Sequence, residues 1–358
     1  MKKSLVVACL MLFGCETEII KGELVLPSEY NGENYLLNTE DELEARASLK
    51  SLSGEIKKGR NGIKVEQEIA IQYLNELRPL TTDYYFKLIE KQLLPELFTA
   101  NTGKPLKLGL EGGLYSAFLF NKYGIENEQL IEKGLYAAAF YNAAYKLVVE
   151  TRDTKTTDKV VALFGAHPDF ANSNNSNLHV NADTFIANYI ARRDANNGAG
   201  FYTNIQNGLI KLQAAINGGS IYTKEQEEAI EVIFTNWEKG NAATAINYIY
   251  GVLSKLSSTN PDESTKASAM HSLSEVLGFL HGFREVNGKI ITDQEIDGLL
   301  MLLNVPVGET PKTENFLNQP AEELPKIVLV LDKLQVIYGF SQNEMEDFKK
   351  NWVSEQNR

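Results

Sequence analysis

Cysteine, histidine and tryptophan are scarce in this chain of 358 residues. It has two cysteines, Cys9 and Cys15, four histidines and two tryptophans. Both cysteines lie within the first fifteen residues, so we expect a body without disulfides that its hydrophobic core alone must hold together. The same scarcity excludes a CxxC motif and cysteine catalysis in the body of the protein.

Other signatures of common chemistry are also missing. No HExxH, GxSxG or P-loop motif is present, so the sequence gives no support to enzymes of those types. Positive charge is in short supply, and the formal net charge is −12. This acidity argues against nucleic acid as a partner, because phosphates would be repelled, and against a polybasic membrane patch.

The N-terminal residues have the pattern of an export signal. Lys2 and Lys3 precede a short apolar run over 5–13, and Gly14 stands directly before Cys15. This order is typical of a lipoprotein signal peptide, and the run is too short to span a bilayer. We therefore predict a signal peptide over 1–14, a lipid on Cys15 and a tether over 15–38. The expected location is the cell envelope, at the outer membrane, with the lipid as the contact to the membrane.

Beyond Asn38 the chain consists almost entirely of amphipathic helix patterns with short polar connections. The predicted fold is all-α over 39–358. A polar tract at 172–177 divides it into two packed bundles of about 39–171 and 182–358. The predicted helices are 39–53, 64–78, 82–99, 111–122, 126–151, 182–195, 203–217, 223–239, 241–257, 263–286, 292–303, 321–338 and 341–354.

One predicted helix, 126–151, is apolar on nearly every side. It has no charged residue from Gly134 to Tyr145, which predicts a central helix surrounded by others. Glu132 enters this helix at its edge. A carboxylate there is either a metal ligand or the partner of Lys133 or of a neighbouring helix, and the sequence leaves both readings open.

The helix predicted over 263–286 carries a polar stripe with two histidine–carboxylate pairs. His271 and Glu275 are one turn apart, as are His281 and Glu285, so each pair can present an imidazole and a carboxylate to one cation. The alternative is a solvated helix face. Gly278 and Gly282 lie on the same stripe. Because glycine is unfavourable inside a helix, they indicate that another backbone or a ligand comes close.

A second candidate site lies at a bend. Pro168 disfavours helical geometry at His167, so His167 and Asp169 can reach a common ion. The alternative is a loop histidine without a ligand.

Three segments resemble an uncharacterised family of exported bacterial lipoproteins related to the imelysin-like proteins. The segments are Glu126-Asn-Glu-Gln-Leu-Ile-Glu-Lys-Gly-Leu135 followed by Tyr141-Asn-Ala-Ala-Tyr145, then Asn188-Tyr-Ile-Ala-Arg-Arg-Asp194, and His271-Ser-Leu-Ser-Glu-Val-Leu-Gly-Phe279. The resemblance implies a double helical bundle and a link to iron or haem uptake, and it adds weight to Glu132, His271 and Glu275. The chain departs from the family at 159–162, where an acidic motif is replaced by Lys-Val-Val-Ala, and at 165–170, which matches only half of a Gly-x-His-x-x-Glu motif.

These observations predict a lipid-anchored binding protein of the envelope. The expected role is an accessory to uptake machinery in acquiring iron, haem or another divalent cation, with His271, Glu275, Glu132, His167 and Asp169 as metal ligands. One alternative is an imelysin-like, metal-dependent envelope peptidase with Glu275 as acid–base group. The other is a structural or interaction lipoprotein, in which Gly278 and Gly282 mark a helix-packing surface.

Overall fold

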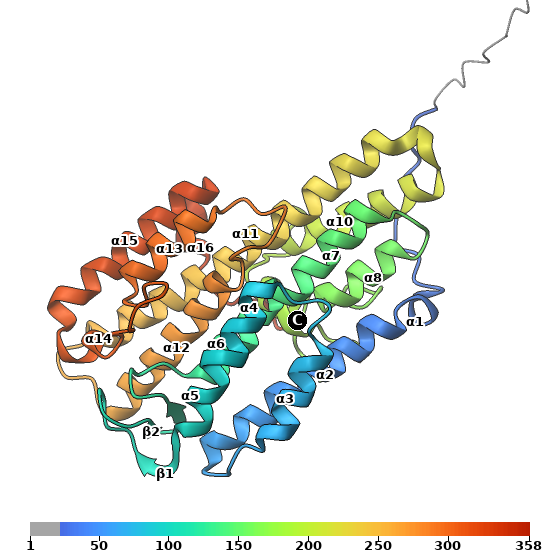
Figure 1. Ribbon diagram of the computed structural model, residues 1–358. Helices are drawn as coiled ribbons and strands as arrows, with labels where there is room; N and C mark the ends of the chain where they lie inside the picture. The colour runs from blue at the N-terminus through green and yellow to red at the C-terminus, as the bar shows by residue number, and fades with distance from the viewer. Residues whose placement is uncertain (1–21) are drawn as a thin grey trace, which may run out of the picture.

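The computed structural model describes residues 22–358, and the predicted signal peptide and Cys15 lie outside this part of the chain. Helices make up most of the described residues, as predicted, and one small three-stranded sheet accompanies them (Figure 1). The N-terminal half contains α1 (Tyr35–Asn38), α2 (Glu40–Lys57), η1 (Lys58–Asn61), α3 (Gln67–Glu76), α4 (Asp83–Leu88), η2 (Ile89–Leu93), α5 (Leu94–Thr99), β1 (Asn101–Pro105), β2 (Gly113–Tyr115), β3 (Phe118–Phe120), α6 (Asn127–Leu135), η3 (Tyr136–Tyr141), α7 (Asn142–Glu150) and α8 (Thr156–Phe164). The C-terminal half contains α9 (Phe185–Ala191), α10 (Phe201–Asn217), η4 (Ser220–Tyr222), α11 (Thr223–Leu256), α12 (Glu263–His281), α13 (Asp293–Leu302), α14 (Asn315–Asn318), α15 (Pro320–Tyr338), α16 (Gln342–Asp347) and α17 (Trp352–Gln356).

The centre of the molecule is formed by α6, η3, α11 and α12. The long helix α11 packs against α10 on one side and α12 on the other, and α12 in turn packs against α6 (Figure 1). The predicted central helix runs through α6, η3 and α7, and every residue from 126 to 144 is buried. Its aromatic side chains fill the core, with Tyr141 at a ring distance of 5.5 Å from Trp237 of α11. The prediction of a helix surrounded by others is confirmed.

The helix predicted over 111–122 is wrong, because this segment forms β2 and β3. The two strands pair antiparallel, with Gly113 opposite Phe120 and Tyr115 opposite Phe118. A Cβ atom on Gly113 would lie 2.6 Å from the carbonyl oxygen of Lys104. The glycine therefore permits a close approach of backbones in the sheet, a use of glycine that helix periodicity does not reveal.

Other helices also differ from the prediction. The helices predicted over 223–239 and 241–257 form one helix of 34 residues, α11. Gly240 continues that helix at a point where a Cβ atom would lie 2.8 Å from the side chain of Ile190, so it serves packing and does not end the helix. Helix α8 was not predicted, and the segment predicted over 341–354 contains two short helices, α16 and α17.

Part of the segment predicted as a tether packs against the helical body. The Tyr30 hydroxyl donates to Asp158 of α8 at 2.7 Å. The backbone N–H of Asn31 donates to the Gln213 amide at 2.9 Å, and that amide donates back to the Asn31 carbonyl at 2.9 Å. Tyr35 is buried in α1. The chain is thus attached to α8 and α10 from about residue 30 onward.

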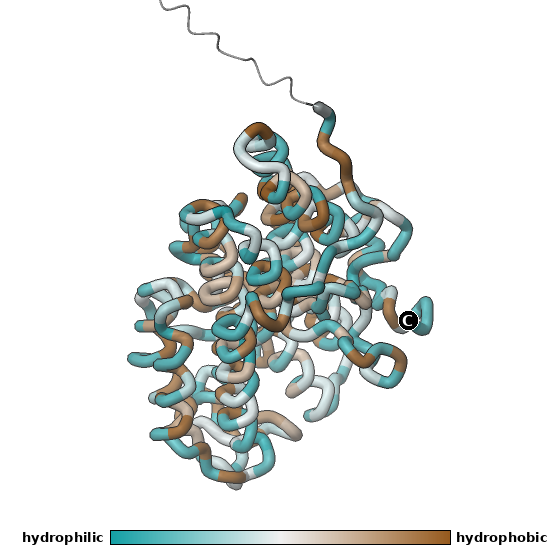
Figure 2. The backbone as a smooth tube through the Cα atoms, turned by 90° about the vertical axis from the view of Figure 1, so that its right-hand side faces the viewer, coloured by the Kyte–Doolittle hydropathy of each residue, from teal (hydrophilic) through white to brown (hydrophobic). Residues whose placement is uncertain are grey.

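Teal and brown turns alternate along the helices in Figure 2, as expected for amphipathic helices around a shared core. None of the helices between residues 22 and 358 is long and apolar enough to cross a membrane. The division into two bundles stays a prediction. Helices from the two sequence groups meet along the α6–α12 contact, and one continuous set of buried apolar residues includes members of both groups.

Candidate functional site

The structure brings three of the five predicted metal ligands together where α6 meets α12. Glu132 is on α6, and His271 and Glu275 are on α12. The two helices approach closely because of Gly278 of α12 and Gly282, which directly follows this helix. A Cβ atom on Gly278 would lie 2.7 Å from the Cβ atom of Lys133, and one on Gly282 would lie 2.3 Å from the carbonyl oxygen of Gly134. The close approach expected at these two glycines is therefore made by the backbone of α6.

The three residues belong to a larger network of charges, which we call the charged cluster. It joins α2, η1, α6 and α12 through ion pairs. Its carboxyl groups outnumber its permanently charged cations by four to three, which gives one excess negative charge when all four are ionised and His271 is neutral. The members of the charged cluster are Lys57, Arg60, Glu126, Glu128, Glu132, Lys133, His271 and Glu275.

Glu132 is fully engaged by protein donors. One oxygen accepts from Lys133 Nζ at 2.6 Å, and the other accepts from Lys57 Nζ at 3.1 Å and from Ser53 Oγ at 2.7 Å. Burial alone would raise the pKa of Glu132, but the ammonium groups of Lys133 and Lys57 lower it to about 2. Of the two alternatives predicted for Glu132, the structure therefore shows the carboxylate paired with lysines.

His271 lies between two carboxylates. Its Nδ1 is 2.6 Å from Oε2 of Glu126, and its Nε2 is 3.4 Å from Oε2 of Glu275. The ring stacks on Phe118 of β3 with centroids 4.4 Å apart. When Glu126 is ionised it accepts the Nδ1–H, and the lone pair of the neutral imidazole then lies on Nε2 and faces Glu275. Within residues 22–358, that Oε2 of Glu275 is buried and has no hydrogen-bond partner.

Burial sets the direction of the pKa values around this histidine. It lowers the pKa of His271 to about 4 and raises the pKa of Glu275. It also raises the pKa of Glu126 and of Glu128 to about 7, against the opposing effect of the Arg60 guanidinium. All these shifts reduce the buried charge, as expected where carboxylates are in excess.

Arg60 connects the cluster to the sheet. Its Nε is 2.6 Å from Oε1 of Glu126, and a second guanidinium nitrogen pairs with Glu128. The guanidinium also lies 5.4 Å from the ring centroid of Phe118. One aromatic ring thus contacts both Arg60 and His271, and it positions the imidazole beside Glu126.

The other predicted pair is elsewhere in the molecule. His167 Nδ1 lies 2.8 Å from Oδ1 of Asp169, near the ring of Tyr35. The second carboxylate oxygen of Asp169 accepts from the Asn181 amide at 3.1 Å. The two residues meet each other, as expected at this bend, but the fold does not bring them to the charged cluster.

His281 and Glu285 are not partners. Helix α12 ends at His281, and Glu285 follows with a positive φ of 61°. His281 instead lies with its Nε2 2.8 Å from the hydroxyl of Tyr84 of α4. The one-turn spacing holds only while the helix continues, which explains the failure of this pairing.

The sequence patterns did not indicate four members of the charged cluster, which are Lys57, Arg60, Glu126 and Glu128. The contact of His271 with Glu126 joins residues 145 positions apart, and no periodicity predicts such a pair. One signal was available, since Lys57-Lys-Gly-Arg60 is a basic run and 126–132 is an acidic one. Matching the two would have predicted ion pairs between the helices that carry them.

In the part of the chain that the structure describes, no group of three or more His, Cys, Asp or Glu side chains is arranged to hold a metal ion. What the cluster offers a cation is a pair of donor atoms, Nε2 of His271 and Oε2 of Glu275. Any further ligands would come from water or from a molecule that arrives with the ion.

Comparison of the chain with protein-family models, with curated proteins and with solved structures finds no match. The resemblance to imelysin-like lipoproteins therefore stays a prediction.

Proposed function

We propose that the protein is a lipid-anchored binding protein of the cell envelope that captures a divalent cation between His271 and Glu275. The observation that carries this proposal is the distance of 3.4 Å between Nε2 of His271 and the unpartnered Oε2 of Glu275. Two ligands of a tetrahedral ion with bonds of about 2.0–2.1 Å lie about 3.4 Å apart. The two donors thus have the spacing of one edge of such a site.

The surroundings of His271 support the same role. Metal-binding histidines commonly donate their second ring N–H to a carboxylate, which fixes the ring and its tautomer. Glu126 is placed to accept from Nδ1 at 2.6 Å. When its four carboxyl groups are ionised against three positive side chains, the charged cluster has one excess negative charge, which favours binding of a cation there.

A cation with two protein ligands keeps several coordination positions open. Such a site suits capture and handover more than permanent storage, because the ion can arrive and leave with other ligands attached. We therefore assign the protein an accessory role in the acquisition of iron or another divalent cation. A lipid on Cys15 would hold it at the membrane beside uptake machinery.

Calorimetric titration of the full chain in detergent with Fe²⁺, Zn²⁺ and haem tests the proposal. We expect saturable binding of a divalent ion. His271→Asn keeps a donor near the position of Nδ1 and removes Nε2, so it should weaken binding by about tenfold or more. Glu275→Gln should weaken it similarly. Unchanged binding in both variants would overturn the assignment, and saturable binding of haem alone would replace the cation with a different ligand.

Two matched variants control for adventitious binding to histidine. His179→Asn alters a histidine outside the charged cluster, and His167→Asn alters the predicted pair at the bend. Both should bind the ion as the parent protein does. If His167→Asn alone weakens binding, the site lies at the bend and the role given to His271 is wrong.

A structural or interaction lipoprotein is the second candidate, and one observation favours it. Gly278 and Gly282 press against the backbone of α6, and Lys133 neutralises Glu132 in the same contact. In this case the charged cluster only joins helices. This candidate function predicts that no ion in the titration shows saturable binding.

A further inference from the structure

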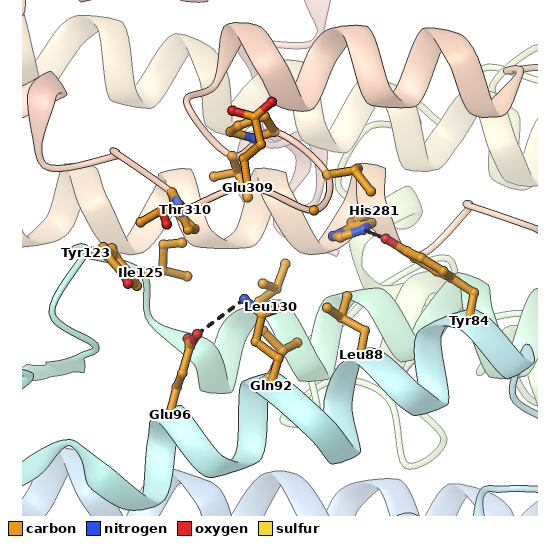
Figure 3. A pocket seen from close by; sticks show the side chains of 16 residues that line it. Tyr84, Leu88, Gln92, Glu96, Tyr123, Ile125, Leu130, His281, Glu309 and Thr310 are labelled. Carbon is orange, nitrogen blue, oxygen red and sulfur yellow. Dashed lines mark hydrogen bonds between the residues drawn. The ribbon is translucent and has the colours of Figure 1, made fainter.

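A cavity lies between α4, η2 and the loop over 305–311. It encloses about 430 Å³, which is within the range of small-molecule sites. Figure 3 shows His281 and Tyr84 at one end, Glu96 below, and the loop with Glu309 and Thr310 above. The charged cluster is not part of its lining.

His281 gives this cavity an unused polar group. The residue is only 5% exposed. Its Nε2 lies 2.8 Å from the Tyr84 hydroxyl, whereas its Nδ1 is buried without a hydrogen-bond partner within residues 22–358. In Figure 3 the second ring nitrogen is turned away from Tyr84, along the cavity. A buried polar atom of this kind is costly unless a ligand or water satisfies it.

The contact with Tyr84 bears on what that nitrogen can do. In the neutral imidazole one ring nitrogen donates and the other accepts. When the Tyr84 hydroxyl donates to Nε2 of His281, Nδ1 carries the ring proton and requires an acceptor.

The charged residues that line the cavity are acidic. Glu96 accepts from the amides of Gln92, Asn121 and Asn127, at 3.2, 2.7 and 3.0 Å. Glu309 is exposed at the loop, and neither lysine nor arginine is among the lining residues. Part of the wall is apolar, including Leu88, Ile125, Leu130 and Val305. The lining thus favours a cationic or neutral ligand with an apolar body over an anion.

We infer that this cavity binds a small aliphatic amine that also carries a carbonyl or hydroxyl acceptor. The acceptor takes the Nδ1–H of His281, the aliphatic part contacts the apolar wall, and the ammonium group faces Glu96 and Glu309. This site is separate from the one proposed for the cation, so either can fail without the other.

Three related probes test the inference by calorimetry on the full chain in detergent. Leucinamide has the amine, the acceptor and the aliphatic chain, 4-methylpentanamide lacks the amine, and leucine adds a carboxylate. We expect leucinamide to bind with a dissociation constant below about 1 mM, and the other two to bind more weakly. Absence of saturable leucinamide binding, or equal binding of leucine, would overturn the inference.

Variants locate the bound probe. His281→Phe keeps a ring and removes the donor, so it should weaken leucinamide binding by about tenfold. Glu309→Gln changes an exposed residue that should not affect folding, and we expect about a two- to fivefold loss. Glu150→Gln alters an exposed carboxylate of α7 outside the lining and should change nothing. If His281→Phe does not fold, Glu309→Gln and the three probes still test the inference. Parental leucinamide affinity in Glu309→Gln, together with equal binding of the three probes, would contradict a site in this cavity.

Discussion

Lys133 is a buried cation whose position depends on its partners. Its side chain is 4% exposed, and its ammonium nitrogen lies 2.6 Å from Glu132 and 3.8 Å from Glu275. The rings of Tyr136 and Tyr189 are within 5.5 and 5.1 Å. Opposite charges and aromatic faces together offset the loss of water around the ammonium. These contacts raise the pKa of Lys133 although its burial acts to lower it.

Replacing this lysine should therefore destabilise the whole fold. Lys133→Met retains the length of the side chain but leaves two buried carboxylates without the ammonium between them. We expect the free energy of unfolding to fall by about 3–5 kcal/mol, measured by urea denaturation followed by circular dichroism.

Lys146→Met is the matched control for this change. Lys146 is exposed on α7, so the same substitution should alter stability by no more than about 0.5 kcal/mol. Equal effects of the two variants would mean that the ion pairs of Lys133 contribute nothing.

The sequence predicted single residues of the site better than their partners. His271 and Glu275 are one helical turn apart, so their proximity follows from the helix itself. The contacts of Glu126 with His271 and Arg60 depend on how α6, α12 and η1 pack. That packing is a property of the fold, and no local pattern contains it.

At the scale of elements, helix positions followed from amphipathic periodicity, whereas glycines misled. The predicted helix at 111–122 contains Gly112 and Gly113, which instead bring strand backbones together. Gly240 was read as a boundary, but it lies inside α11 against Ile190. A glycine in a sequence indicates a close contact or a break, and only the surroundings decide which.

The close approach of α6 and α12 predicts the effect of replacing Gly282. In Gly282→Ala, the added Cβ atom would lie 2.3 Å from the backbone of Gly134, which cannot move without shifting α6. We expect a loss of about 1–3 kcal/mol in the free energy of unfolding, measured by chemical denaturation.

Gly298→Ala provides the opposite case in α13. No atom lies within 4 Å of the Cβ position there, so alanine should stabilise the helix by about 0.5–1 kcal/mol. If both substitutions stabilise the protein, the helices are not in the close contact described.

At the scale of the whole molecule, the predicted lipid is the feature most directly tested. In Cys15→Ser the residue that would carry the lipid is lost, and none of the helices over 22–358 can span a membrane in its place. We expect the variant to leave the membrane fraction when the cells that produce it are fractionated.

Cys9→Ser serves as the control, because the predicted cleavage removes Cys9 with the signal peptide. It should fractionate as the parent protein does. Retention of Cys15→Ser in the membrane fraction after a high-salt wash would contradict lipid anchoring at this residue.

The attachment of residues 30–38 to α8 and α10 also determines which end of the molecule an anchor would hold. Gly22 accepts a hydrogen bond from Tyr222, at the turn that begins α11. The sheet lies at the opposite end of the molecule in Figure 1, and α11, with 34 residues, is about 50 Å long. His271 stacks on β3 of that sheet. If the protein is anchored through Cys15, the turn before α11 would lie nearest the membrane. The charged cluster would then lie at the end of the molecule away from the membrane, where it can meet dissolved ions.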